Sequence, residues 1–174
     1  MMRVVYFDCP SGASGDMILG ALVDAGVSLD ALRTELAKLP LGGYRLTARE
    51  VRKGAFRATK VDVEVDATAY HQRNLPEILR LLEQSGLPGR VKADAARIFT
   101  RLAAAEARVH GTTVEAVHFH DVGAVDAIVD VSGAVAGLHL LGVEAVHVSA
   151  LPLGGGMVDG PHGKIPIPAP GTAE

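Results

Sequence analysis

Two histidines and two carboxylates lie within a short, mostly apolar segment that runs from His118 to Asp126. If the segment is extended, His118 and His120 share one face while Phe119 points into the core. Two imidazoles on one face can bind zinc or nickel, and the adjacent carboxylate of Asp121 can complete the ligand set. The pattern also fits a buried strand whose histidines are only hydrogen-bonded, because perturbed His and Asp side chains occur in structural networks too.

A second group of candidate residues follows the first apolar run of the chain. Asp8 ends this run, and the next residues form a Ser/Gly loop that leads into a helix, with Ser11, Gly12, Ser14, Gly15 and Asp16 as its candidate binding residues. Glycines let backbone N–H groups approach a ligand, and a helix N-terminus favours an anion, so the loop predicts a phosphate site. The loop contains neither a Walker motif nor the dinucleotide fingerprint. In the alternative interpretation, Ser14 is only an N-cap and Asp16 only complements the helix dipole.

One face of the last predicted helix combines carboxylates with glycines. Asp126, Asp130, Gly133 and Gly137 recur at helical spacing and therefore share this face. The small residues allow either a strand to pack closely against them or a ligand to lie at the end that bears Asp126. We expect both, with the glycines serving packing and Asp126 serving the site.

The surrounding pattern predicts an α/β layered sandwich with a mixed sheet, helices packed on it and at least one antiparallel hairpin. Apolar periodicity and turn signals predict strands at 3–8, 44–54, 59–66 and 144–151, and helices at 16–25, 28–38, 76–85, 90–109 and 122–141. The 174 residues are expected to form a single domain, with a loop and a proline-rich tail at 152–174. Ligands of such folds bind beyond the carboxyl ends of the strands, where Asp8 lies.

Composition narrows the class of protein. Cys9 is the only cysteine, so no intrachain disulfide can form, and no cationic apolar leader is present, which together predict a cytoplasmic location. Cys9 itself is expected to be a small buried residue. The net charge of -3 with dispersed arginines gives no reason to expect nucleic-acid binding, and no apolar run reaches the roughly 20 residues that span a membrane.

Several blocks of the sequence, taken in order, resemble the nickel-insertion protein family of nickel-pincer cofactor biosynthesis, the LarC family. The blocks are residues 6–9, 11–17, 118–126, 162–163 and 166–170. The resemblance implies a CTP-dependent cyclometallase that inserts nickel into pyridinium-3,5-bisthiocarboxylic acid mononucleotide. The implied product serves lactate racemase-type enzymes. CTP with a divalent cation such as Mg or Mn is implied to bind in a C-terminal part of the same protein.

Joined to the residue chemistry, the resemblance suggests a role for each candidate. His118, His120 and Asp121 are expected to hold or relay nickel, and the Ser/Gly loop to bind the phosphate of the mononucleotide. Asp8 or Asp126 is expected to take the proton that the pyridinium ring loses when the nickel–carbon bond forms. A metal relay must release its ion, which suits two histidines and a carboxylate better than a closed four-ligand site.

The sequence departs from the family pattern at two places, and two other functional classes are also compatible with it. Asp121 stands where the family usually has Glu, and the segment from Pro168 to Thr172 departs from the PAPAT-like pattern of the family. The chain is expected to be the N-terminal part of a longer protein, and a homo-oligomer is compatible with it. A metal-dependent phosphohydrolase would use the same Asp and His residues without CTP. A non-catalytic nucleotide- or nickel-binding module would bind without turnover.

Overall fold

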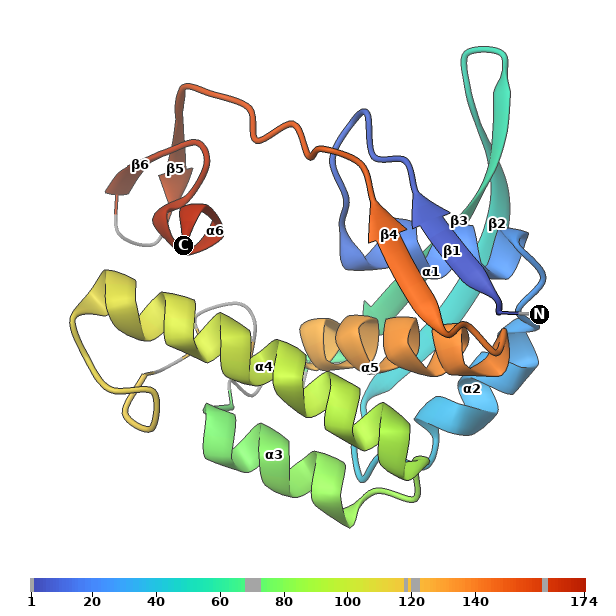
Figure 1. Cartoon of the computed structure of the whole chain (residues 1–174), viewed down its shortest axis with the longest axis horizontal. Coiled ribbons are helices and arrows are strands. Elements are labelled where there is room, and N and C mark those ends of the chain that lie inside the picture. Colours follow the sequence, from blue (N-terminus) through green and yellow to red (C-terminus); the bar gives the residue numbers. More distant parts are fainter. Residues whose placement is uncertain (1, 68–72, 118, 120–122, 161–162) are drawn as a thin grey trace.

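The computed structural model describes residues 2–67, 73–117, 119, 123–160 and 163–174, which form helices and short sheets (Figure 1). In chain order the elements are β1 (Val4–Phe7), α1 (Gly15–Asp24), α2 (Leu29–Leu36), β2 (Tyr44–Lys53), β3 (Phe56–Val65), α3 (Leu75–Gln84), α4 (Gly89–His110), α5 (Val125–Leu140), β4 (Ala145–Val148), β5 (Met157–Gly160), β6 (Gly163–Pro166) and α6 (Pro170–Ala173).

The strands form three separate two-stranded sheets. β1 pairs with β4 in parallel, while β2 with β3 and β5 with β6 form antiparallel pairs. The predicted α/β class and the predicted antiparallel hairpin are confirmed. Parallel and antiparallel pairs do not, however, share one mixed sheet, because the β2–β3 hairpin packs on α1 through β3 instead of joining the edge of β1 or β4.

Local signals in the sequence explain where the helices begin and end. The hydroxyl of Ser28 accepts a hydrogen bond from the N–H of Ala31 at the start of α2. Asn74 and Glu77 form a reciprocal capping box at the start of α3. Gly111, with a φ of 61°, ends α4 in the left-handed conformation. The predicted helices are therefore confirmed, with ends that differ by a few residues.

The glycine face of α5 packs against another helix, which corrects the prediction that a strand lies there. A Cβ added to Gly133 would lie 2.9 Å from the side chain of Leu19, and one added to Gly137 would lie 2.9 Å from Leu22. Both leucines are buried and belong to α1. The small residues therefore bring the axes of α1 and α5 close together, and this contact fixes the relative position of the two helix N-termini.

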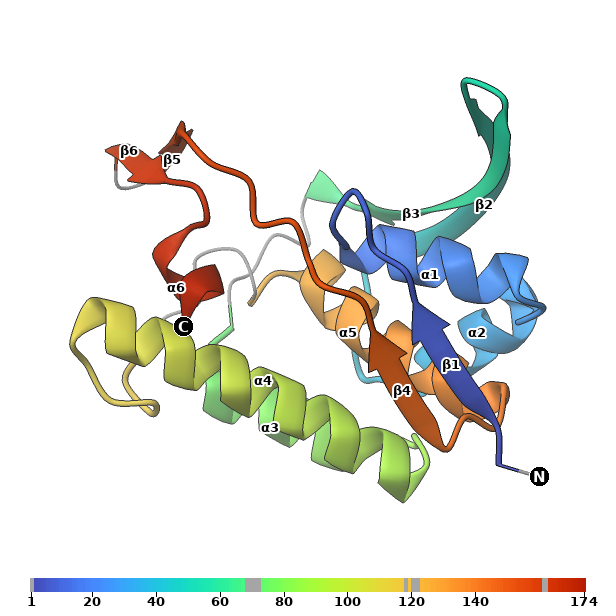
Figure 2. The ribbon, with the colours of Figure 1, turned by 45° about the horizontal axis from the view of Figure 1, so that its top comes forward.

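The segment after β4 holds more structure than a loop and a proline-rich tail. An extended stretch, 149–156, leads from β4 to the β5–β6 hairpin and α6, which lie near the C-terminal end of α4 (Figure 2). Arg108 of α4 forms an ion pair with Glu174, which follows α6. This ion pair and the packing of α6 on α4 connect the end of the chain to the helical layer.

No helix among the described residues is both long enough and apolar enough to cross a membrane.

Alanine in place of Gly20 is expected to destabilise the fold, because this glycine lets α1 approach the backbone of β3. An added Cβ would lie 2.3 Å from the carbonyl oxygen of Thr59, which cannot move without shifting the strand. We expect the free energy of unfolding to fall by about 2–3 kcal/mol, even though alanine favours helix. Chemical denaturation measures this change. Gly86→Ala, whose Cβ would meet Lys38 at an ordinary 3.5 Å, is the control; equal stability of the two variants would contradict the close contact.

Candidate functional site

The loop between β1 and α1 is held in place at its start. Cys9 is buried, as predicted, and its N–H donates to the hydroxyl of Ser149 at 2.9 Å. Gly12 has a φ of 86°, and its N–H donates to the carbonyl oxygen of Cys9 at 3.1 Å, which closes a tight turn. Asp8 and Ser11 are exposed on either side of this anchor. The loop therefore presents its polar side chains to solvent from a fixed backbone.

Ser14 stands at the N-cap position of α1 but does not cap the helix with its side chain. Its backbone is extended, and its hydroxyl donates to the carboxylate of Asp16 in the first turn. The first N–H groups of α1 consequently have no side-chain acceptor at the N-cap. They form a positively polarised end that can bind an anionic group beside the carboxylate of Asp16.

Asp130 of α5 lies directly against the start of α1. A Cβ added to Gly15 would lie 2.2 Å from Oδ2 of Asp130 and 2.4 Å from its Cβ. Gly15 is therefore required for this close approach, rather than only for loop freedom. The sequence placed Asp130 on the same helix face as Asp126, but assigned a site role to Asp126 alone.

Burial sets the protonation state of Asp130. Desolvation, followed by the negative charges of Asp16 and Asp126, raises its pKa to about 7. Its Oδ1 is buried and has no hydrogen-bond partner among the residues that the structure describes. At neutral pH this carboxyl group therefore exchanges a proton readily, and any cation that binds nearby would favour its ionised form.

Asp126 faces solvent at the start of α5. Its carboxylate accepts a hydrogen bond from the N–H of Ala127 at 2.9 Å. The N-cap residue of this helix is Ala124, which offers no side-chain cap. Asp126 lies one helical turn before Asp130 on α5. The two carboxylates therefore form a row that runs from the partly buried contact with Gly15 to the exposed start of the helix.

The predicted nickel ligands His118, His120 and Asp121 lie outside the described residues, as does His162. The residues around them are anchored in the core. Val117 and Phe119 are buried, as the alternation predicts for Phe119, although neither belongs to a strand.

Gly123, on the other side of the predicted ligands, is packed against the backbone of Arg73. The N–H of Arg73 donates to the carbonyl oxygen of Gly123 at 3.1 Å. A Cβ on Gly123 would lie 2.2 Å from the carbonyl oxygen of Arg73. Gly123 therefore holds the path of the chain just before it enters α5.

The residues that the structure describes do not by themselves form a metal site. Within that part of the chain, no group of three His, Cys, Asp or Glu side chains is arranged to hold a metal ion. The carboxylates of Asp16, Asp126 and Asp130 supply negative charge at the junction of α1 and α5.

Comparison with known proteins assigns this chain to a family. A family model described as nickel insertion protein matches residues 5–174. The chain belongs to this family. A relative from Gloeobacter violaceus, named "Putative nickel insertion protein", is 54% identical over 171 residues, which are 97% of this chain and 41% of the relative.

Other relatives with the same name are similar to this chain to about the same degree. Those from Citrifermentans bemidjiense and Roseiflexus castenholzii are 50% and 53% identical, each over 99% of this chain. These matches cover 45% and 43% of the two relatives, so this nickel insertion family chain spans less than half of their length. No solved structure matches the chain significantly.

Proposed function

We propose that this chain takes part in inserting nickel into pyridinium-3,5-bisthiocarboxylic acid mononucleotide in the cytoplasm, in a reaction that requires CTP in the complete protein. The observation that carries the proposal is the convergence of Asp16, Asp126 and Asp130 where the Ser/Gly loop enters α1. This junction combines polarised N–H groups, negative charge and a carboxyl group that titrates near neutral pH, and it belongs to a chain of the nickel insertion family.

The chemistry of insertion calls for a proton acceptor. A nickel–carbon bond forms as the ring carbon–hydrogen bond breaks, and the released proton must pass to a base, while two sulfur atoms bind the same metal. Asp8 and Asp126 are exposed and remain the proposed acceptors. Asp130, with a pKa of about 7, is suited to receive that proton next and release it near neutral pH.

Charge also suggests how the substrate lies. Three carboxylates beside the N-terminus of α1 repel a phosphate group that binds without a counter-charge. We therefore propose that the phosphate lies on the N–H groups of Ser14 to Asp16 only when positive charge is present nearby. The pyridinium ring and the nickel ion supply that charge. His118, His120 and Asp121 are proposed to hold the metal.

The remaining participants are proposed to lie outside this chain. CTP, with Mg or Mn, is proposed to bind in the part of the relatives that the match does not cover, which is more than half of their length. Lactate racemase-type enzymes are the proposed recipients of the product.

Replacing both His118 and His120 with alanine is expected to weaken nickel binding at least about 100-fold, because two of the three proposed ligands are lost. Isothermal titration calorimetry with nickel, with and without a pyridine mononucleotide, measures the effect. The control is His139→Ala with His147→Ala, which removes two exposed histidines from α5 and β4. Equal nickel affinity in the two double variants would show that the His118 to Asp121 segment is not the metal site.

A binding-only role for this chain is the second candidate, and the short coverage of the relatives favours it. It predicts that the chain binds nickel or nucleotide yet inserts no metal until the rest of the protein is added. Restored insertion on adding the missing part of the Gloeobacter violaceus relative would support this role; insertion by the chain alone would exclude it.

A further inference from the structure

The parallel β1–β4 pair lacks the cover that parallel strands normally have. Neither strand has a second neighbour among the described residues, so both outer edges are open. Parallel strands occur almost always in sheets with both faces covered, and a two-stranded sheet has little stability by itself. Additional structure is therefore expected against this pair.

Both faces of the pair expose apolar side chains. Val4 and Tyr6 of β1, on one face, are 46% and 62% exposed. Val146 and Val148 of β4, which pair with Val5 and Phe7 and so lie on the opposite face, are 51% and 56% exposed. Exposed apolar side chains that lie together on one face, as Val146 and Val148 do, commonly mark an interaction site.

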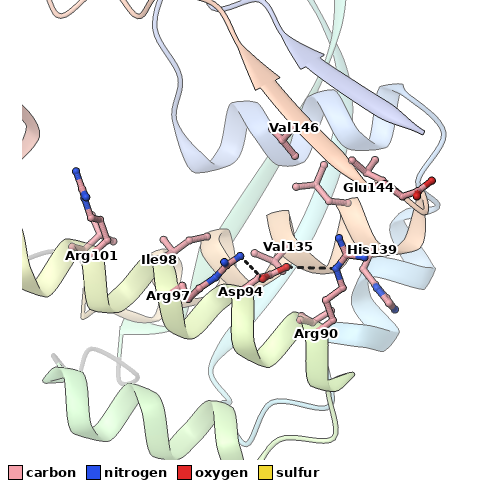
Figure 3. A pocket seen from close by; sticks show the side chains of 13 residues that line it. Arg90, Asp94, Arg97, Ile98, Arg101, Val135, His139, Glu144 and Val146 are labelled. Atoms are coloured by element: carbon pink, nitrogen blue, oxygen red, sulfur yellow. Dashed lines mark hydrogen bonds and ion pairs between the residues drawn. The ribbon is translucent and has the colours of Figure 1, made fainter. Parts of the chain in front are cut away.

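A groove of about 650 Å³ adjoins the face of the pair that bears Val146 and lies between β4, α4 and α5 (Figure 3). Ile98 of α4 and Val146 of β4 face the groove from opposite sides, and Val135 of α5 forms part of its floor. Its lining is therefore mainly aliphatic, as expected of a surface that receives another apolar element.

Arginines on α4 form the rim of the groove. Arg90 and Arg97 both pair with Asp94, at 3.8 Å and 2.6 Å, as the dashed lines in Figure 3 show. Arg101 makes no ion pair with a residue in the described part of the chain. With Glu144 as the other acidic residue of the lining, the rim keeps a net positive charge.

We propose that the α4–β4 groove and the open β1–β4 pair, here called the open face, bind the part of the family protein that the relatives carry outside the matched region. The matched residues make up only 41% of the Gloeobacter violaceus relative, so ample chain exists to cover the open face. The docking element presents aliphatic side chains to Ile98 and Val146, and acidic side chains to Arg101. This inference rests on family membership and not on the proposed reaction.

A second copy of the chain fits the open face less well. In a twofold contact the same patch meets itself, so the two facing surfaces would carry the same net positive charge. Like charges across an interface oppose association. The remaining part of the longer protein carries no such constraint.

Cysteine labelling tests the inference. Cysteine replaces either Val146 or Ile98 in this chain, and the aligned residue in the full-length Gloeobacter violaceus relative. Each protein is labelled with a maleimide reagent. Mass spectrometry of its peptides then gives the labelling rate at each introduced cysteine. We expect labelling at both positions to be at least about tenfold slower in the full-length protein. Phe56→Cys, at the exposed tip of the β2–β3 hairpin, is the control and should react equally fast in both.

Two results would overturn the inference. Equal labelling rates at Val146 and Ile98 in the short and full-length proteins would show that the open face stays uncovered. Slow labelling in the short chain that becomes fast on dilution would show that a second copy is the occupant. Two separate positions, one on a strand and one on a helix, keep the test informative if either variant folds poorly. Because no nickel or nucleotide enters the measurement, its outcome is independent of the proposed function.

Discussion

Alanine in place of Gly15 is expected to lower the free energy of unfolding by about 3 kcal/mol and to weaken nickel binding. The added Cβ would lie 2.2 Å from Oδ2 and 2.4 Å from Cβ of Asp130, so α1 and α5 would have to separate at their N-terminal ends. Such overpacking of a rigid contact is costly. The separation would also pull Asp16 away from Asp126 and Asp130. Thermal unfolding and nickel calorimetry on the same protein measure both effects.

Gly89 supplies the matched control for Gly15. It is likewise the first residue of a helix, α4, and a Cβ there would meet nothing within 4 Å. Gly89→Ala is therefore expected to leave both stability and nickel binding unchanged. The double variant Gly15→Ala with Asp130→Gly removes the clash and should recover part of the lost free energy of unfolding. The recovery is reduced by about 1 kcal/mol because glycine inside a helix is unfavourable. If Gly15→Ala alone behaved like Gly89→Ala, the contact with Asp130 would be wrong.

Replacing Asp130 with asparagine is expected to stabilise the chain at alkaline pH but not at acidic pH. The pKa of Asp130 is raised to about 7 in the folded chain from an ordinary value of 3.8, so the folded state binds the extra proton between these values. The free energy of unfolding therefore falls as pH rises from about 4 to about 7 and stays low above pH 7. Asparagine is uncharged at every pH and removes this loss.

The size of the effect follows from the partial burial of Asp130. The full shift would correspond to about 4 kcal/mol, but solvent screening of a partly exposed carboxyl group reduces the expected gain to about 1–2 kcal/mol. Urea denaturation at pH 4.5 and pH 8 measures it. Asp159→Asn, which alters an exposed carboxylate in β5, is the control and should show no such pH-dependent gain. A uniform change of Asp130→Asn stability at both pH values would mean that the carboxyl group titrates normally.

The sequence alone determined the helices, the hairpin and the family. Periodic apolar residues and caps such as Ser28 and Gly111 act within a few residues, so their effect can be inferred without tertiary contacts. The blocks at 6–17 and 118–126 were also sufficient to suggest the nickel insertion family, which the family model then confirmed.

Only the tertiary structure decided which elements meet. The strands form three separate pairs and not one mixed sheet, and the glycines of α5 receive leucines of α1 in place of a strand. The meeting of Gly15 with Asp130, residues far apart in the chain, depends on how α1 crosses α5. A raised pKa arises from desolvation and neighbouring charges, and these exist only once distant segments have packed together.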